Sequence, residues 1–405
     1  MRDGLIATLL SVVTALTRLP FVADRLWEWD SVLYARALEQ GFHVGDVLPQ
    51  MRPHPPGYIF YVGTAELAKL LGLDSDHALV SVSVLASGIA AAAVYLLCRR
   101  FAGRGLALAL AIAFAADPLV WLHGEVAMPY MLLAPISAGL ALAFRDARGA
   151  DLRRVVLTSF LFGLIGGFRQ DLLLFLFPLW LWTLWPAAGR TRLGAVVAFA
   201  AGCLLWFVPS ALLSDGIVAY VGRAVGQLTG VSGTSANTER SLALNVVLVG
   251  DSLFWAGLLL TVGLLVLGLS RGLARLRGQR LPDDGEAAFF AVWLLPALLF
   301  YVFVHIGEWG FVLSIVPGIY VLSRGCSGAS GSAPRSSRAS CSRTPSSWRR
   351  CSSRATIRCS LTRRSSRTTG PPMRRPRGSA TTPRRARSSS PQPRCSLRAT
   401  TCPIA

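Results

Sequence analysis

The stretch Leu79–Cys98, LVSVSVLASGIAAAAVYLLC, holds twenty residues without a charged side chain. A helix rises about 1.5 Å per residue, so a helix of this length matches a hydrocarbon core of about 30 Å. The whole chain has 405 residues, of which 53% are hydrophobic and 15% charged, and its mean hydropathy is +0.49. Its apolar residues come in runs rather than in amphipathic alternation. The sequence therefore predicts an all-α, polytopic transmembrane protein.

Similar apolar runs recur along the chain and predict about ten spans. The predicted spans are Leu5–Val22, Leu79–Cys98, Leu106–Leu122, Met128–Phe144, Val155–Phe168, Leu172–Trp185, Leu193–Leu213, Leu242–Leu269, Ala287–Val304 and Gly310–Leu322. The fifth and sixth are short and flank the sequence FRQD, so they form either a full hairpin or a re-entrant pair. The first also resembles a signal peptide, but no small-residue cleavage site follows it, which favours an uncleaved helix.

The arginines predict the orientation of these spans. Four loops are basic: RRFAGR at 99–104, RDARGADLRR at 145–154, GRTR at 189–192 and RGLARLRGQR at 271–280. Basic residues in short loops stay on the cytoplasmic side, so we expect a cytoplasmic N-terminus in a multi-pass cell-membrane protein. The segment 23–78, the turns near His123 and Arg169, the loop 214–241 and the sequence HIGEW near His305 are then extracytoplasmic.

The net charge of +20 belongs to the C-terminal tail. Residues 326–405 contain 18 Arg, no Lys, no acidic residue and six of the eight cysteines, whereas residues 1–325 have a net charge of only +2. This composition cannot bury enough apolar surface to offset the entropy of ordering the chain. We therefore divide the chain into a transmembrane domain, 1–325, and a disordered Arg/Ser-rich tail, 326–405.

Three hypotheses account for the tail. A native basic arm binds anionic lipid headgroups, or it binds RNA without sequence preference. The third hypothesis is a frameshift, because the composition changes abruptly within the tenth predicted span, and one Lys against 40 Arg indicates a GC-rich gene. The frameshift hypothesis is favoured, and a specific nucleic-acid partner is not expected. The nucleotide sequence around the codon for Gly325 decides between them.

Unusual polar residues follow the first span, in WEWDSVLYARALEQGF at 27–42. One interpretation is an interfacial helix with Trp27, Trp29 and Tyr34 as an aromatic belt and Asp30 as its N-cap. Further on, RPHPPGYIFYVGTAELAKLLG at 52–72 places a rigid proline pair before an amphipathic segment that is too short to be a clear crossing. This segment predicts a helix lying on the outer membrane surface.

Together these stretches resemble the GT-C superfamily of integral-membrane glycosyltransferases, in the branch of protein O-mannosyltransferases and the bacterial aminoarabinose transferase of lipid A. That branch opens its first outer loop with an Asp-Glu-x-x-Tyr-Ala motif; here Asp30, Tyr34 and Ala35 match it, and Ser31 replaces the second acid. The segment HPPG at 54–57, HGEVAMPYMLLAPISAGLALAFR at 123–145 and VHIGEWGFVLSIVPGIYVL at 304–322 are similar to further family segments. The resemblance covers roughly residues 1 to 323.

The resemblance implies transfer of a sugar from a polyprenyl-phosphate donor to a hydroxyl of a glycan, lipid or protein acceptor, at the outer surface of the bilayer. A carboxylate takes the acceptor proton, and Asp30 is the candidate base. Glu125 is a second catalytic carboxylate, which orients the acceptor or joins Asp30 at a divalent cation. The leaving phosphate needs cationic donors or a metal. The implied substrate-binding residues are Tyr34, Arg52, His54, Arg169, His305 and Glu308.

Structural roles compete with these assignments. Glu125 also fits dipole compensation at a helix start, Arg169 and Asp171 also fit a simple ion pair, and His54 also fits a brace for the proline turn. His305 and Glu308 also fit an ordinary loop. A divalent cation stays open, because the sequence contains no dense ligand cluster. Two other classes are a transporter or flippase of a lipid-linked sugar, and a non-catalytic membrane partner, although no internal repeat supports a transporter.

Overall fold

The computed structural model describes residues 2–26, 28–45, 50–233, 242–257 and 284–323. The chain divides between Arg335 and Ser336, so these ranges all belong to its first unit. The predicted tail, its boundary after residue 325 and the aromatic Trp27 lie outside the described residues. The hypotheses about the tail therefore stay predictions.

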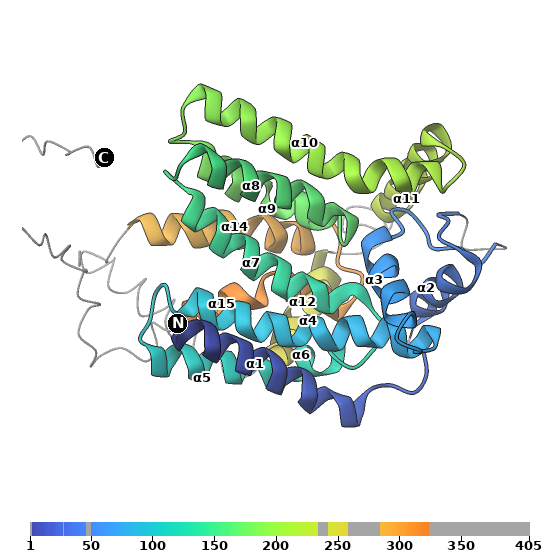
Figure 1. The fold of residues 1–405 in the computed structure, drawn as a ribbon, viewed down its shortest axis with the longest axis horizontal. Coiled ribbons are helices and arrows are strands. Elements are labelled where there is room, and N and C mark those ends of the chain that lie inside the picture. The colour runs from blue at the N-terminus through green and yellow to red at the C-terminus, as the bar shows by residue number, and fades with distance from the viewer. Residues whose placement is uncertain (1, 27, 46–49, 234–241, 258–283, 324–405) are drawn as a thin grey trace, which may run out of the picture. The chain divides into compact units, whose positions relative to one another are not determined.

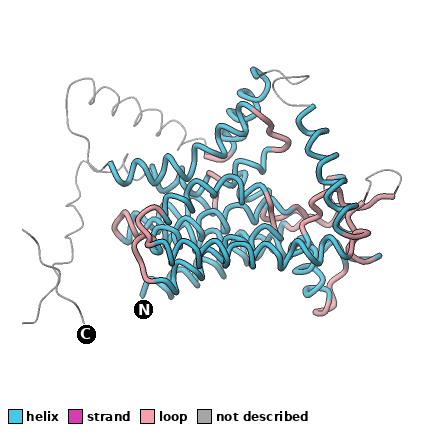
Figure 2. Tube along the Cα trace, turned by 90° about the horizontal axis from the view of Figure 1, so that it is seen from above, coloured by secondary structure: helices cyan, strands magenta, loops and turns pink. Residues whose placement is uncertain are grey.

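Every secondary-structure element within these ranges is a helix (Figures 1 and 2). The α-helices are α1 (Arg2–Arg18), α2 (Trp29–Gln40), α3 (Ile59–Lys69), α4 (Ser75–Cys98), α5 (Arg104–Ala115), α6 (Pro118–His123), α7 (Leu133–Ala147), α8 (Leu152–Leu164), α9 (Asp171–Leu184), α10 (Gly189–Leu212), α11 (Ile217–Gly233), α12 (Leu242–Trp255), α14 (Asp284–Phe303) and α15 (Val316–Leu322). Four 3₁₀ turns complete the fold: η1 (Leu19–Phe21), η2 (Pro129–Leu132), η3 (Ile165–Gly167) and η4 (Trp309–Ser314). The predicted all-α class is confirmed for the described residues.

Helix α4 is the centre of the fold. It starts at the N-cap Asp74, whose carboxylate accepts a hydrogen bond from the backbone of His77 at 2.8 Å. It then runs for 24 residues to Cys98, with most of its side chains buried against α1, α3, α5 and α7. Gly88 permits the close approach of α1, because a Cβ there would lie 2.4 Å from the backbone oxygen of Ser11. Small residues commonly bring helices together in this way in membranes.

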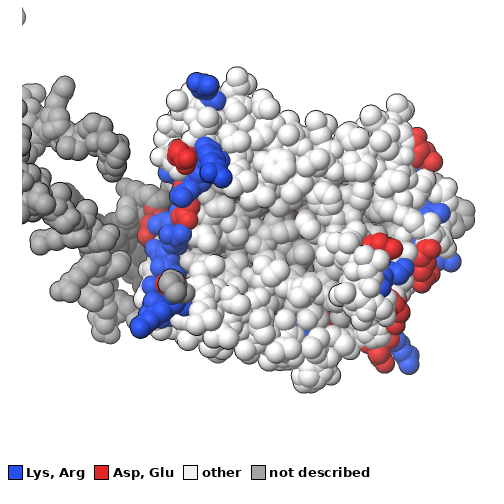
Figure 3. Space-filling view, viewed as in Figure 1, with Lys and Arg blue, Asp and Glu red and all other residues white. Residues whose placement is uncertain are grey.

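Among the described residues, four helices are long and apolar enough to cross a bilayer: Arg2–Phe21, Ser75–Cys98, Gly189–Leu212 and Glu286–Phe303. Large apolar side chains stay exposed along them, such as Leu5 on α1 at 63% and Leu193 on α10 at 66%. In the space-filling view, charged residues gather toward two opposite ends and leave a broad uncharged band between them (Figure 3). The chain is thus a membrane protein by its apolar helices, while the count of about ten spans stays a prediction.

Two predicted spans are interrupted in the structure. The third breaks at Asp117, whose carboxylate caps the short helix α6 by accepting from the backbone of Leu119 at 3.0 Å. Proline follows at the first helical position, where it needs no hydrogen-bond partner. The tenth is divided into η4 and α15, with Ile315 between them. Neither of these two spans is a continuous helix. Side-chain capping accounts for the break at Asp117, whereas Ile315 makes no side-chain capping bond.

The predicted outer loop 214–241 contains a helix that the sequence analysis missed. Helix α11 follows α10 after a tight turn in which Asp215 and Gly216 both have positive φ, 63° and 92°. Residues 234–241 and the end of the predicted eighth span, which extends to Leu269, lie outside the described residues. The surface segment before α4 was predicted as a helix, and α3 confirms the helix; its position on a membrane stays a prediction.

Helices α8 and α10 cross so closely that only glycine fits at their contact. A Cβ on Gly202 would lie 2.3 Å from the backbone oxygen of Phe160 and 2.7 Å from the backbone nitrogen of Leu164. We expect Gly202→Ala to lower the free energy of unfolding by about 1–3 kcal/mol, because a methyl group must push the two helices apart. Thermal unfolding in nanodiscs measures this loss.

Gly139 on α7 is the matched control. A Cβ there meets no atom within 4 Å, so Gly139→Ala should leave stability unchanged or raise it by up to about 1 kcal/mol through helix propensity. Equal melting temperatures for the two variants would contradict the close crossing of α8 and α10.

Candidate functional site

A cavity of about 660 Å³ lies where α2 and the segment 54–58 face α9, α10, α11 and α14. This volume is in the range of small-molecule sites. Five of the eight residues predicted for the site line the cavity: Asp30, His54, Arg169, His305 and Glu308. They come from four separate parts of the sequence, so the fold brings together what the resemblance implied.

Asp30 and His54 form a pair on one side of the cavity. His54 Nε2 lies 3.4 Å from Asp30 Oδ2, and their side chains are 23% and 28% exposed. Asp30 lies in the first turn of α2, and Glu28 occupies the N-cap position, so the predicted N-cap role of Asp30 was wrong. The acidic side chain still suits the positive end of the helix dipole. Its carboxylate is held by histidine and open to the cavity.

The hydrogen bonds of His54 define its protonation. Its Nδ1 lies 2.8 Å from the carbonyl oxygen of Pro55, which only accepts, so Nδ1 carries a proton. Its Nε2 faces the Asp30 carboxylate. Burial alone lowers the pKa of His54, but the hydrogen bond and charge of Asp30 and the Pro55 carbonyl outweigh burial, and the net effect raises the pKa. The histidine therefore holds a second proton toward Asp30 more readily than a free imidazole does. The predicted brace for the proline turn is present too, since His54 binds Pro55.

Arg169 is the cation of the cavity, and its side chain is only 3% exposed. Its Nη2 and Nε donate to the two carboxylate oxygens of Asp171 at 2.6 and 3.2 Å, so the predicted pairing is confirmed. Aromatic rings surround the guanidinium, whose carbon lies 4.8 Å from the centre of Tyr58, 5.1 Å from Tyr130 and 5.3 Å from Phe311. Such contacts stabilise a desolvated cation. The pair and the rings hold one positive charge at a defined place in the wall.

Tyr58 joins the two halves of the site. It follows the proline pair in a left-handed conformation with φ of 50°, directly after Gly57 with φ of 81°. A non-glycine residue in this region costs free energy and is held by its surroundings, often at functional sites. Burial raises the pKa of Tyr58 to about 12, with Arg169 opposing the rise, so the phenol stays a neutral donor near neutral pH. The sequence analysis missed Tyr58, although its place after PPG was a signal.

The remaining wall of the cavity is apolar. Aromatic rings from α9, α10, α14 and η4 form most of it, and one face of α11 adds aliphatic side chains: Phe175, Trp206, Phe207, Phe300, Phe311, Val221, Val225 and Leu228. Val225 and Leu228 are 54% and 67% exposed even though they line the cavity. The cavity therefore combines polar groups with apolar side chains, and its α11 side chains Val225 and Leu228 are exposed, which suits an amphipathic ligand.

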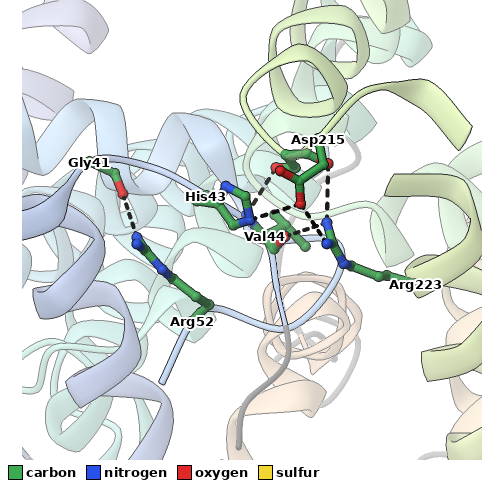
Figure 4. A network of polar contacts seen from close by, with 7 residues as sticks. Gly41, His43, Val44, Arg52, Asp215 and Arg223 are labelled. Carbon is green, nitrogen blue, oxygen red and sulfur yellow. Dashed lines mark hydrogen bonds and ion pairs between the residues drawn. The ribbon is translucent and has the colours of Figure 1, made fainter. Parts of the chain in front are cut away.

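Polar contacts fasten the loop 41–58 to the corner between α10 and α11 (Figure 4). Asp215 lies 3.3 Å from Nε2 of His43 and accepts from Nη2 of Arg223 at 2.6 Å. Arg223 also donates to the carbonyl of Val44 at 3.0 Å, and Tyr220 donates to the carbonyl of Pro56 at 3.1 Å. The hydrogen bond from Arg223 lowers the pKa of Asp215. This fastening fixes His54 and α11 on opposite sides of one cavity.

Three predicted residues do not line the cavity. Tyr34 is 2% exposed and packs against the rings of Tyr61 and Tyr58, so it supports the wall from behind. Arg52 donates to the carbonyl of Gly41 at 3.3 Å. Glu125 lies near Arg18, whose charge opposes the rise in pKa that burial causes in the Glu125 carboxyl. The predicted partnership of Glu125 with Asp30 is absent from this cavity, because α6 and η2 turn that acid toward the end of α1.

Five more polar residues that were not predicted also line the cavity: Tyr130, Gln170, Tyr220, Gln227 and Tyr301. Gln170 stands between the two charged residues of FRQD and was passed over because it is uncharged. Within the described ranges no group of three or more His, Cys, Asp and Glu side chains is arranged to hold a metal ion. Metal dependence therefore stays open.

Chemically, the cavity combines a carboxylate with an adjacent histidine, a buried guanidinium and an apolar wall. A carboxylate of this kind can accept a proton, and a fixed guanidinium can bind an anionic oxygen. Comparison with known proteins adds no relative: no protein-family model, curated protein or solved structure matches the chain.

Proposed function

We propose that this chain is a membrane glycosyltransferase that moves a sugar from a polyprenyl-phosphate donor to an acceptor hydroxyl on the extracytoplasmic face. The observation that carries the proposal is that one cavity is lined by the Asp30–His54 pair, by Arg169 and by many aromatic side chains. A polyprenyl-phosphate sugar likewise combines a charged, hydroxylated head with an apolar chain.

In the proposed reaction the acceptor oxygen attacks the anomeric carbon of the sugar. A new carbon–oxygen bond forms, the bond between that carbon and the phosphate oxygen breaks, and the electron pair leaves with the phosphate. Asp30 takes the proton of the acceptor hydroxyl, a contribution typically worth about 100 to 10,000-fold in rate. Arg169 stabilises the charge that grows on the phosphate, and attack from the opposite side inverts the anomeric configuration.

The distribution of charge supports an extracytoplasmic site. Helix α4 begins near α2 and α3 and ends at Arg99 and Arg100, so its 24 residues separate two ends by about 36 Å. Asp3, Arg99 and Arg104 form an ion cluster at the second end, and Arg100 pairs with Asp146 there. By the positive-inside rule this arginine-rich end is cytoplasmic, and the Asp30 end faces outward.

A transporter or flippase of a lipid-linked sugar is the alternative function. The observation in its favour is the broken helix pair α5 and α6, since discontinuous helices are common in transporters. The carboxylate–histidine pair fits the enzyme, in which a carboxylate takes the proton of the acceptor hydroxyl.

Transfer by the purified protein tests the proposal. The full chain in nanodiscs is mixed with polyprenyl-phosphate mannose, glucose or galactose and with alcohol, glycan or peptide acceptors, and the release of polyprenyl phosphate is followed. Release that requires an acceptor supports the enzyme. Stable binding of every donor without release would count against it.

The raised pKa of His54 predicts the pH dependence of transfer. Protonated His54 is paired with Asp30 and adds positive charge beside the leaving phosphate; this form is complete below the ordinary pKa of about 6.5 and is lost as pH rises through the higher pKa in the folded protein. We expect kcat/KM of the wild type to fall as the pH rises through this raised pKa. His54→Gln should be slower and should lack this fall. An unchanged alkaline limb in the variant would assign the titration to another group.

A further inference from the structure

Gln170 lines the cavity and carries an amide that has no hydrogen-bond partner among the described residues. It lies at the N-terminal boundary of α9, between Arg169 and Asp171, and lines the same cavity as both. Its Oε1 and Nε2 are both buried and have no hydrogen-bond partner among the described residues. A primary amide has two N–H donors and an oxygen with two lone pairs. The Gln170 amide therefore neither donates nor accepts a hydrogen bond among the described residues.

An unpartnered amide at such a position is unfavourable for folding alone. Buried donors and acceptors in proteins are nearly always paired, and leaving one unpaired costs stability. The two chain neighbours of Gln170 pair with each other: Arg169 donates from Nε and Nη2 to Asp171, and Asp171 also accepts from the backbone of Leu172 at 3.0 Å. An apolar side chain would suit the aromatic wall better. The amide is therefore best explained by a ligand that supplies a donor and an acceptor together.

Sugar hydroxyls have that property, because each one both donates and accepts. Gln170 follows Arg169 in the chain and lines the same cavity, so a phosphate bound at Arg169 would place its attached sugar in the cavity that Gln170 lines. We propose that the Gln170 amide hydrogen-bonds a hydroxyl of the donor sugar and selects which hydroxylated sugar the cavity accepts. This inference rests on the proposed function and adds a specificity-determining residue to it. A site built to bind a hydroxyl rejects an analogue that lacks it by a large factor.

Binding by the full-length chain in nanodiscs tests the inference. The probes are decaprenyl phosphate alone and decaprenyl-phosphate mannose, glucose and galactose. In the wild type, at least one sugar-bearing probe should bind ten times more tightly than decaprenyl phosphate. Gln170→Leu should remove that advantage and leave the affinity for decaprenyl phosphate within about twofold, because the phosphate and the chain do not use the amide.

A set of deoxy analogues identifies the hydroxyl. Each hydroxyl of the best sugar is replaced in turn by hydrogen, and one replacement should weaken binding to the wild type tenfold or more. The same replacement should cost almost nothing in Gln170→Leu, since the two changes remove one interaction. Additive losses would overturn the assignment of Gln170 to that hydroxyl.

Stability provides a second, ligand-free readout. Gln170→Leu and the longer Gln170→Met remove unpaired polar atoms, so without ligand both should melt at the wild-type temperature or above. A lower melting temperature in both variants would show that the amide has a structural partner and would overturn the inference. If Gln170→Leu keeps the sugar preference, the inference fails and the proposed function stands. If the wild type does not bind decaprenyl phosphate, the proposed function fails first.

Discussion

Asp30→Asn should reduce sugar transfer by about 100-fold or more while leaving the protein folded. Asparagine keeps the size of the side chain and can still accept a hydrogen bond from His54, but it cannot take the proton of the acceptor hydroxyl. Asp30 lies in the first turn of α2, where loss of its charge costs at most about 1 kcal/mol of stability. The rate should therefore fall far more than the stability. Initial rates of polyprenyl-phosphate release and thermal unfolding, measured on the same preparation, separate the two effects.

Glu28→Gln is the matched control for this experiment. Glu28 lies two residues before Asp30, at the N-cap of the same helix, and makes no side-chain capping hydrogen bond. The Glu28→Gln variant loses one negative charge at the same helix end as Asp30→Asn, but Glu28 does not line the cavity. The transfer rate of Glu28→Gln should therefore stay within about twofold of the wild type. Equal losses in the two variants would indicate a general electrostatic effect and would exclude Asp30 as the base.

Arg169→Gln should unfold or strongly destabilise the protein. A double variant that also changes Asp171 should distinguish this loss of stability from a loss of transfer activity. The single change leaves Asp171 without its partner, and breaking a buried pair costs several kcal/mol, about 3 here because Asp171 is 22% exposed. Arg169→Gln combined with Asp171→Asn replaces the ion pair by two neutral amides and should recover most of that stability. Transfer should remain about 100 to 1000-fold below the wild type, as for other lost transition-state donors.

A second ion pair provides the control for the double variant. Arg100 and Asp146 are paired at 2.5 Å at the opposite end of the molecule from the cavity. Arg100→Gln with Asp146→Asn should leave transfer within about twofold of the wild type, because exposed pairs contribute little. Near-normal transfer by the Arg169 double variant would show that Arg169 has only a structural role and does not bind the phosphate.

The sequence predicted the apolar helices because long uncharged runs have no other stable form in a bilayer. It missed the break at Asp117, although an acid followed by Pro118 is itself a start signal for a helix. It also missed α11, whose residues Val218, Val221, Val225 and Leu228 recur at helical spacing. In both cases the sequence contains a local pattern that predicts a helix. It was overlooked because the longer apolar runs beside it gave a stronger prediction.

The sequence predicted only part of the candidate site. The cost of a charge among apolar runs predicted that Arg169 and Asp171 pair, and the pair is present. Which acid meets which basic residue depends on how the helices rotate and pack, and the sequence does not contain this directly. Asp30 therefore meets His54, while Glu125 turns to Arg18. Gln170 carries no charge, so only the structure reveals that its amide is buried beside Arg169.

Cleavage and translocation of the donor, followed together in sealed proteoliposomes, test the central claim most directly. A fluorescent polyprenyl-phosphate sugar is placed in the leaflet that the Asp30 end of the protein faces, and a soluble acceptor is added on that side only. We predict acceptor-dependent release of polyprenyl phosphate, with no movement of intact donor to the other leaflet and with loss of release in Asp30→Asn. Movement of intact donor across the bilayer without cleavage, at the same rate in both proteins, would contradict the enzyme and identify a transporter.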